Sequence, residues 1–204
     1  MIRPVRPAED AGAICEIYNH YIAETVITFE VEPLTSDAMQ RRIEEIASRF
    51  PYLVYEQGGK VLGYCYATTW HSRAAYDRTV EMTIYLHRDR VGKGIGPMLY
   101  QELIRLLRRA EFHVAVATIT LPNTQSVALH ENFGFRKVAH FTEVGCKFGR
   151  WLAVGCWELR LCEARPTQTD RGRENDNFPC PDRHSAPKRK LRLYRFVQHH
   201  LEVP

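Results

Sequence analysis

Apolar residues follow two different rhythms along the first 162 positions of the chain. Spacings of three and four residues are typical of helices with one buried face, and runs rich in β-branched and aromatic residues are typical of strands. The helical spacing predicts four helices, at 8–22, 36–50, 97–107 and 126–132. The strand pattern predicts seven strands, at 2–7, 52–56, 61–69, 79–87, 113–120, 136–144 and 151–161.

Residues with strong local preferences set the expected boundaries. Ser36 is a residue type that caps helix N-termini, and Pro51 is expected to end the helix that follows it. The pair Gly58-Gly59 permits the positive φ angles of a tight hairpin. The resulting order mixes hairpins with helical crossovers. We therefore expect an α+β or mixed α/β domain and not a doubly wound dinucleotide-binding fold.

The periodic pattern ends at Leu161, where the composition changes. The stretch CEARPTQTDRGRENDNFPCPDRHSAPKRK is polar and contains four of the eleven prolines. Residues 163–204 carry nine Lys and Arg against six Asp and Glu, whereas residues 1–162 carry nineteen against eighteen. Most of the net charge of +4 therefore lies in this last part. We expect one domain at 1–162, long enough for a core, and a disordered basic tail at 163–204.

Further features of the sequence favour a cytoplasmic protein. No run approaches the ~20 apolar residues of a membrane helix, and the first residues lack the apolar segment of a secretory signal. None of the six cysteines forms a Cys-x-x-Cys pair, which excludes the spacing of zinc knuckles and thioredoxin-like motifs. We expect these thiols to be reduced.

The most specific chemical pattern is a glycine-rich loop between a strand and a helix. The segment RDRVGKGIGP places Gly92, Gly94 and Gly96 where a backbone can approach a ligand closely. Free N–H groups and the positive end of the following helix favour a diphosphate there. The loop lacks the Gly-Lys-Ser/Thr ending of a P-loop, and its place in the strand order argues against a dinucleotide fold. A plain glycine-rich turn is the alternative.

A second motif lies downstream, in LPNTQSVALHENFGF, where Asn123 is followed by His130 and Gly134-Phe135. Strand, Gly-x-Gly-x-Gly loop, helix, strand and N-x(6)-H-x(3)-GF in this order resemble the GNAT superfamily of acetyl-CoA-dependent N-acetyltransferases. The resemblance is closer to its phosphinothricin and methionine-sulfone N-acetyltransferases, through IYNHYIAETVITFEVEP, FPYLVYEQGGKVLGYCYA, WHSRAAYDRTVEMTIYL and VGCKFGRWLAVGCWEL. It implies a central, mostly antiparallel sheet with a splayed pair of strands, flanked by helices.

The resemblance also implies which residues bind acetyl-CoA, the co-substrate; it implies no metal. In that superfamily, backbone amides of the glycine loop hold the diphosphate, and the preceding strand runs beside the pantetheine arm. The corresponding positions here are Ile84, Tyr85, Leu86, Gly92, Lys93, Gly94, Ile95, Gly96, Pro97 and Asn123. The family usually has Arg or Gln where this loop has Val91, and Arg90 or Lys93 is the candidate for the missing contact.

Acetyl transfer requires an uncharged amine, so a nearby carboxylate is useful as a base. Glu81 is the only acid in the apolar segment 80–86, and the resemblance assigns it this role; a solvent-facing carboxylate is the alternative. His130 stands where many superfamily members have a Tyr that protonates the CoA thiolate, and imidazole can donate a proton near neutral pH. The alternatives are a surface histidine and, for Asn123, a helix cap.

The acceptor site is implied by the resemblance as well. A free amino acid offers a carboxylate, which an Arg can bind with two hydrogen bonds. The family's substrate contacts fall on His71, Ser72, Arg73, Glu81, Met82 and Thr83. Further candidates are Arg78 as a second cation and Phe29, Trp70 and Tyr76 as pocket walls. Lys147 and Arg150 are expected at the substrate mouth or against a partner subunit, because the family tends to form homodimers.

The sequence thus predicts an N-acetyltransferase that acts on the α-amine of a small glutamate-like amino acid, such as phosphinothricin, methionine sulfone or methionine sulfoximine. One alternative is the same chemistry on a protein or peptide amine, for which the near-neutral body offers no evident acidic cleft. Another is binding of nucleic acid or a partner through PKRKLRLYR in the tail. A basic run of this kind is more often a solvated segment, and we expect neither nucleic acid nor membrane as a partner.

Overall fold

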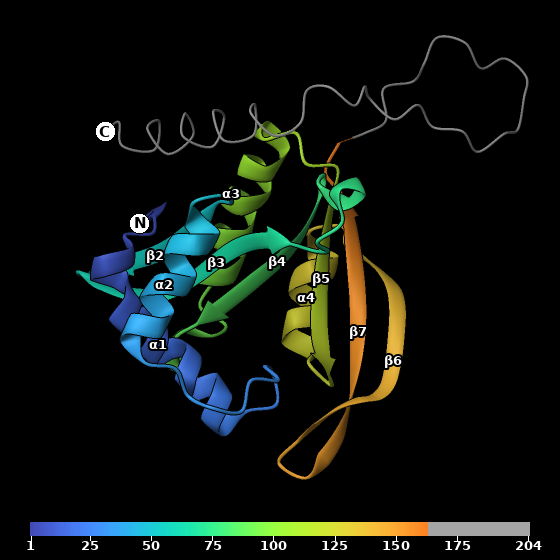
Figure 1. Cartoon of the computed structure of the whole chain (residues 1–204), viewed down its shortest axis with the longest axis horizontal. Helices are drawn as coiled ribbons and strands as arrows, with labels where there is room; N and C mark the ends of the chain where they lie inside the picture. The colour runs from blue at the N-terminus through green and yellow to red at the C-terminus, as the bar shows by residue number, and fades with distance from the viewer. Residues whose placement is uncertain (163–204) are drawn as a thin grey trace, which may run out of the picture.

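The computed structural model describes residues 1–162 (Figure 1). Their helices are α1 (Pro7–Glu24), α2 (Ser36–Ala47), α3 (Ile95–Arg109) and α4 (Thr124–Asn132). Their strands are β1 (Ile2–Pro4), β2 (Tyr52–Gln57), β3 (Lys60–Thr69), β4 (Thr79–Leu86), β5 (Val114–Leu121), β6 (Arg136–Lys147) and β7 (Arg150–Arg160). The order agrees with the sequence prediction. The expected tail at 163–204 lies outside the described residues.

These strands form one sheet in the order β1-β2-β3-β4-β5-β7-β6. Neighbouring strands are antiparallel except β4 and β5, which run parallel and pair only over residues 79–81 and 114–116. Beyond these residues the two strands diverge, as Figure 1 shows. The mixed α/β class and the mostly antiparallel sheet with a splayed pair of strands are therefore confirmed.

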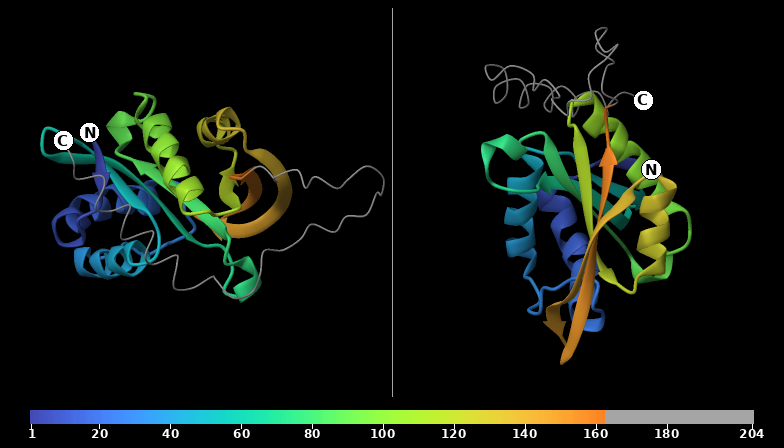
Figure 2. Two further views of the ribbon diagram at one scale, coloured as in Figure 1. Left: turned by 90° about the horizontal axis from the view of Figure 1, so that it is seen from above. Right: turned by 90° about the vertical axis from the view of Figure 1, so that its right-hand side faces the viewer.

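Helices cover both faces of the sheet (Figure 2). α1 and α2 pack on one face, where their apolar side chains form a buried cluster with Val54 and Tyr64. α3 and α4 lie on the opposite face, over a larger cluster that includes Leu103 and Trp157. Within the described residues, no helix is long and apolar enough to cross a bilayer.

The structure corrects both expected boundaries of the second helix. Thr35, and not Ser36, caps α2, because its hydroxyl oxygen accepts the N–H of Ala38 at 3.2 Å. The backbone decides between the two hydroxyl residues, since a cap requires the extended conformation that Thr35 adopts. The helix ends at Ala47, before Pro51, and a short turn joins it to β2.

Candidate active site

The pairing of β4 with β5 ends at Glu81 and Val116. Beyond them, and within residues 1–162, no strand lies against that side of β4, and this region is called the split below. Backbone N–H and C=O groups that lack ladder partners require other ones. The split is therefore suited to an extended ligand that carries amide groups of its own.

The register of β4 decides which residues face the split. His87 donates its N–H to the carbonyl of Leu62 on β3 at 2.9 Å. In an antiparallel pair, the backbone groups of successive residues point alternately toward and away from the partner strand, so Tyr85 bonds to β3 whereas Ile84 and Leu86 do not. The carbonyl of Leu86 instead accepts the hydroxyl of Tyr21 on α1 at 2.7 Å, which leaves the N–H of Leu86 and the backbone of Ile84 for the split. The geometry supports the predicted contact of Ile84, leaves only the N–H of Leu86 for the contact predicted there, and corrects the backbone contact predicted for Tyr85.

The glycine loop lies between β4 and α3. Gly92 and Gly94 have φ angles of +76° and +80°, a region that residues with a side chain rarely adopt. Gly94 is the N-cap of α3 and offers no capping side chain, so the first N–H groups of the helix, from Ile95 and Gly96, have no partner within it. Such a helix end attracts anions, and it supports the predicted diphosphate site.

The other residues predicted to bind the co-substrate differ in what they can offer to it. Lys93 and Arg90 are exposed beside the loop, and either side chain can supply positive charge to an anion there. Pro97 lies in the first turn of α3 and has no N–H to donate. Asn123 caps α4, since its Oδ1 accepts the N–H of Ser126 at 3.1 Å. The capping alternative is therefore confirmed, and only the amide nitrogen of that side chain is left for a ligand.

Glu81 lies half-buried where the split begins. Val80 and Met82 point into the core beneath α3, so the alternation of strand side chains turns Glu81 and Thr83 to the face covered by α1 and α2. Burial raises the pKa of Tyr66 on that face to about 12, and the nearby charge of Glu81 adds to the effect. Met82 is 3% exposed, so its side chain packs in the core and only its backbone is left for the predicted acceptor contact.

His130 is 3% exposed between α3 and α4, and the alternative of a surface histidine is therefore wrong. Its Nδ1 lies 2.7 Å from the carbonyl oxygen of Ser126, and its Nε2 lies 2.7 Å from the hydroxyl of Tyr100. Because a carbonyl only accepts, Nδ1 carries the proton and Nε2 accepts from Tyr100. Burial lowers the pKa of His130. The ring is neutral and has no free N–H, which does not support the predicted donation of a proton to the thiolate.

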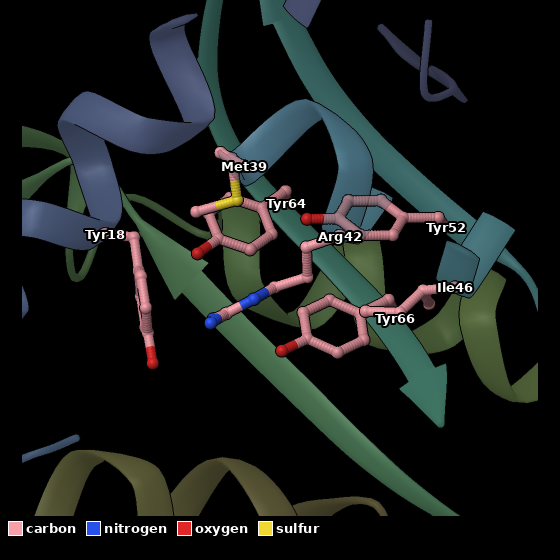
Figure 3. Close-up of a pocket in the computed structure, with 7 residues that line it drawn as sticks. All are labelled: Tyr18, Met39, Arg42, Ile46, Tyr52, Tyr64 and Tyr66. Atoms are coloured by element: carbon pink, nitrogen blue, oxygen red, sulfur yellow. The ribbon is translucent and has the colours of Figure 1, made fainter. Parts of the chain in front are cut away.

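A polar cluster occupies the face under α1 and α2. Arg42 donates to both carboxylate oxygens of Glu30, at 2.8 and 3.2 Å, and Tyr18 donates its hydroxyl to the same carboxylate at 3.0 Å. Figure 3 shows the guanidinium of Arg42 between the rings of Tyr18 and Tyr66. The surrounding pocket is lined by Tyr18, Met39, Arg42, Ile46, Tyr52, Tyr64 and Tyr66. Thr83 hydrogen bonds to Tyr66, so the pocket adjoins β4.

The hairpin of β6 and β7 packs against the loop that joins α1 to α2. Lys147 is 3% exposed and donates to the carbonyl of Thr28 at 2.8 Å. The hydroxyl of Thr28 lies 2.9 Å from that of Tyr18. The ring of Phe29 lies directly against Gly145, where a side chain would have no room. Of the two roles open for Lys147, these contacts support the one at the substrate mouth.

The predicted substrate residues before β4 lie in an exposed loop. The ring of His71 packs on Trp70 and Tyr76, with centroid distances of 4.1 and 5.1 Å. Ser72 and Arg73 are exposed. The structure thus groups Glu81 and Thr83 with the cluster around Arg42, and it leaves 71–73 outside that cluster.

Sequence reasoning missed several members of this site. Arg42 lies on a helix and Glu30 in a loop, and nothing in the sequence distinguishes either one from an ordinary charged residue on the surface. Their pairing appears only when α2 and the loop pack together. Tyr18 and Tyr100 sit on the apolar stripes of their helices and read as core. A tyrosine hydroxyl on a buried apolar stripe needs a hydrogen-bond partner. That requirement was the one sign in the sequence that these two tyrosines belong to a polar site.

Comparison with known proteins agrees with this arrangement. Residues 2–153 match the family model described as an acetyltransferase (GNAT) domain. The chain is 40% identical over 157 residues to phosphinothricin N-acetyltransferase of Streptomyces viridochromogenes, covering 77% of this chain and 85% of that protein. It is 37% identical over 158 residues to the L-methionine sulfoximine/L-methionine sulfone acetyltransferase of Salmonella typhimurium, covering 76% and 91%.

The fold is shared with solved structures as well. The structure of yncA from Salmonella typhimurium with its cofactor acetyl-CoA superposes with a TM-score of 0.77 at 37% identity, over 83% of this chain and 98% of that one. A family match over most of the chain, relatives well above 30% identity and a shared fold lead to one conclusion. The chain belongs to the GNAT family of acetyltransferases, with acetyl-CoA as the co-substrate.

Proposed function

We propose that this enzyme transfers the acetyl group of acetyl-CoA to the α-amine of a small glutamate-like amino acid, of the phosphinothricin, methionine sulfone or methionine sulfoximine type. The observation that carries the proposal is the position of Glu81, a carboxylate where the split begins, on the same face as the cluster around Arg42. The names of the two relatives described above refer to acceptors of this class.

The chain's own groups hold the co-substrate, which supplies an activated acetyl thioester. N–H groups at the start of α3 bind the diphosphate, and the backbone of Ile84 and the N–H of Leu86 bind the pantetheine arm. A thioester that ends beside Glu81 lies next to unpaired N–H groups of β4, which polarise its carbonyl.

Glu81 then acts as the base. It takes a proton from the acceptor ammonium, directly or through a water, and frees the nitrogen lone pair for attack on the carbonyl carbon. The nitrogen loses a second proton as the amide bond forms. The carbon–sulfur bond breaks, and the CoA sulfur takes up a proton, which balances the transfer.

His130 and Tyr100 act as a positioning pair in this scheme. Their hydrogen bond joins α4 to α3, the helix that follows the diphosphate loop. Gly96 at the start of α3 also lies close to Leu129 of α4 and Ile84 of β4. A shift of α4 would therefore displace the walls of the co-substrate site.

The decisive experiment is an acceptor panel. Purified enzyme and acetyl-CoA are incubated with phosphinothricin, methionine sulfone, methionine sulfoximine, glutamate and a short peptide, and thiol release is followed. Turnover with the first three and not with the peptide is the expected result. Selective turnover of the peptide would instead favour acetylation of protein amines.

The same proposal includes a homodimer in a cytoplasmic setting. The hairpin of β6 and β7 exposes Val138, Phe141, Val144, Phe148 and Trp151, which are 50–65% exposed. Apolar side chains gathered on an edge strand favour a protein partner. Light scattering on the full chain is expected to give twice the monomer mass, and Trp151→Lys is expected to lower the measured mass. A monomeric wild type would reject the dimer.

The cytoplasmic setting is supported by the cysteines. The described cysteines are free thiols, which suits a reducing compartment.

A further inference from the structure

We propose that Arg42 binds an acidic group on the side chain of the acceptor, and that Glu30 occupies the same guanidinium until the acceptor arrives. The inference rests on the proposed function, because it names the part of the acceptor that separates one substrate from another. It assigns specificity to a residue outside the motifs that identify the family.

The cluster around Arg42 is already built to bind a carboxylate. The guanidinium donates to both oxygens of Glu30, and Tyr18 adds a third hydrogen bond to the same group. A planar guanidinium and a hydroxyl that converge on one anion would bind a carboxylate or phosphinate of a ligand in the same way. Glu30 therefore shows which chemical group this cluster recognises.

An acidic group of a ligand can replace Glu30 as the partner of Arg42. Their side chains are 36% and 37% exposed, and ion pairs of that exposure contribute little to stability. Glu30 lies in the loop between α1 and α2, outside any helix or strand, so its side chain can turn away without breaking a backbone hydrogen bond of the sheet. An incoming acid can replace it at low cost.

Strand register places this cluster at a suitable distance from the base. Tyr66, beside Arg42, pairs with Thr83, and Thr68 pairs with Glu81. The two pairs are therefore two residues apart along β4, or roughly 7 Å at the rise of a strand. A glutamate-like acceptor can bring its amine to Glu81 and its distal acid toward Arg42.

Local charges fit this orientation. The buried ammonium of Lys147 lies near enough to Glu30 for their charges to interact, so the distal end of the site holds two cations. The carboxylate of Glu81 is left to attract the ammonium at the other end. The exposed loop with Arg73 remains available for the α-carboxylate.

Arg42→Gln tests the proposal directly. KM is measured for phosphinothricin, whose side chain carries an acidic phosphinate, and for methionine sulfone, whose side chain is neutral. We expect the KM for phosphinothricin to rise on the order of 10-fold or more, the value of a charge-assisted hydrogen bond, while the KM for methionine sulfone changes by less than about 2-fold. The kcat values should stay close to wild type, because the lost interaction is made equally before and during the reaction. Arg41→Gln, an exposed neighbour on the same helix, is the matched control and should change neither KM.

Glu30→Gln should act in the opposite direction. Removing the competing carboxylate leaves Arg42 free, so the KM for phosphinothricin should fall by roughly 2- to 5-fold, the range of a partly exposed ion pair. The KM for methionine sulfone should not fall. This variant keeps the proposal testable if Arg42→Gln folds poorly, which thermal melting would reveal.

Two outcomes overturn the inference. Equal changes in KM for both acceptors in Arg42→Gln would mean that Arg42 only supports the fold. A rise in KM for phosphinothricin in Glu30→Gln would mean that Glu30 helps to bind the acceptor. The proposed function fails separately, if the wild-type enzyme acetylates neither acceptor.

Discussion

The hydroxyl of Tyr100 lies 2.7 Å from Nε2 of His130, in a buried contact that joins α3 to α4. Burial holds the pKa of His130 below its ordinary value of 6.5. At a pH between the lowered pKa of the folded protein and 6.5, the unfolded chain binds a proton at His130 that the folded protein does not. The free energy of unfolding should therefore fall as the solution is acidified below about pH 6.5, by up to about 1.4 kcal/mol per pH unit. Urea denaturation between about pH 7.5 and about pH 5.5 measures this slope.

His130→Gln is the comparison for that experiment. The variant also shows whether the ring positions α4 or transfers a proton. The variant should lose the part of the slope that belongs to His130. If the ring only positions α4, kcat falls without a change in the shape of the pH–rate profile. Loss of one limb of the profile in the variant would instead mean that His130 transfers a proton.

Glu81→Gln should lower kcat/KM on the order of 100-fold or more near neutral pH, because the acceptor ammonium loses its base. The remaining activity should rise toward higher pH, where more of the free amine is neutral. Thiol release as a function of pH measures both effects. Glu45→Gln, an exposed carboxylate on α2, serves as the control. An unchanged pH profile in Glu81→Gln would remove Glu81 from this role.

Gly94→Ala should raise the KM for acetyl-CoA and leave the KM for the acceptor almost unchanged. The φ of +80° is strained for alanine, which should cost about 1–2 kcal/mol of stability and distort the amides at the start of α3. Gly12→Ala is the matched control, because Gly12 lies inside α1 with open space around it. That substitution should stabilise the protein by roughly 0.5–1 kcal/mol. Equal effects of the two variants on the KM for acetyl-CoA would argue against the diphosphate site.

Lys147→Met should raise the KM for the acceptor several-fold and leave the KM for acetyl-CoA unchanged. The apolar side chain fits the buried position, but the carbonyl of Thr28 loses its donor, which typically costs about 1–3 kcal/mol. The distal end of the acceptor site would also lose one of its two cations, which weakens its attraction for an acidic side chain. Lys60→Met, at an exposed hairpin, is the control. If the two substitutions gave the same kinetics, Lys147 would have no part in shaping the acceptor site.

Local pattern predicted the elements and the glycine loop from sequence alone. Helical and strand spacings depend on which residues face the core. That periodicity can be recognised within a short segment of the sequence, as in the apolar stripe of α3. The glycines of the loop were recognisable because their φ angles exclude most other residues. Glu81 stood out for a similar reason, as an acid in an apolar strand.

Only the tertiary structure decided which groups meet. The cluster of Arg42, Glu30 and Tyr18 joins residues from α1, α2 and the loop between them, and no local spacing encodes their contact. His130 was predicted as a proton donor, yet Tyr100 on another helix engages its Nε2. Tyr85 was predicted to face the co-substrate, and the register with β3 turned its backbone away. Sequence thus determined the elements and the chemical types in the site, because both depend on near neighbours. Their orientation, burial and partners depend on packing between distant segments, which only the folded chain brings together.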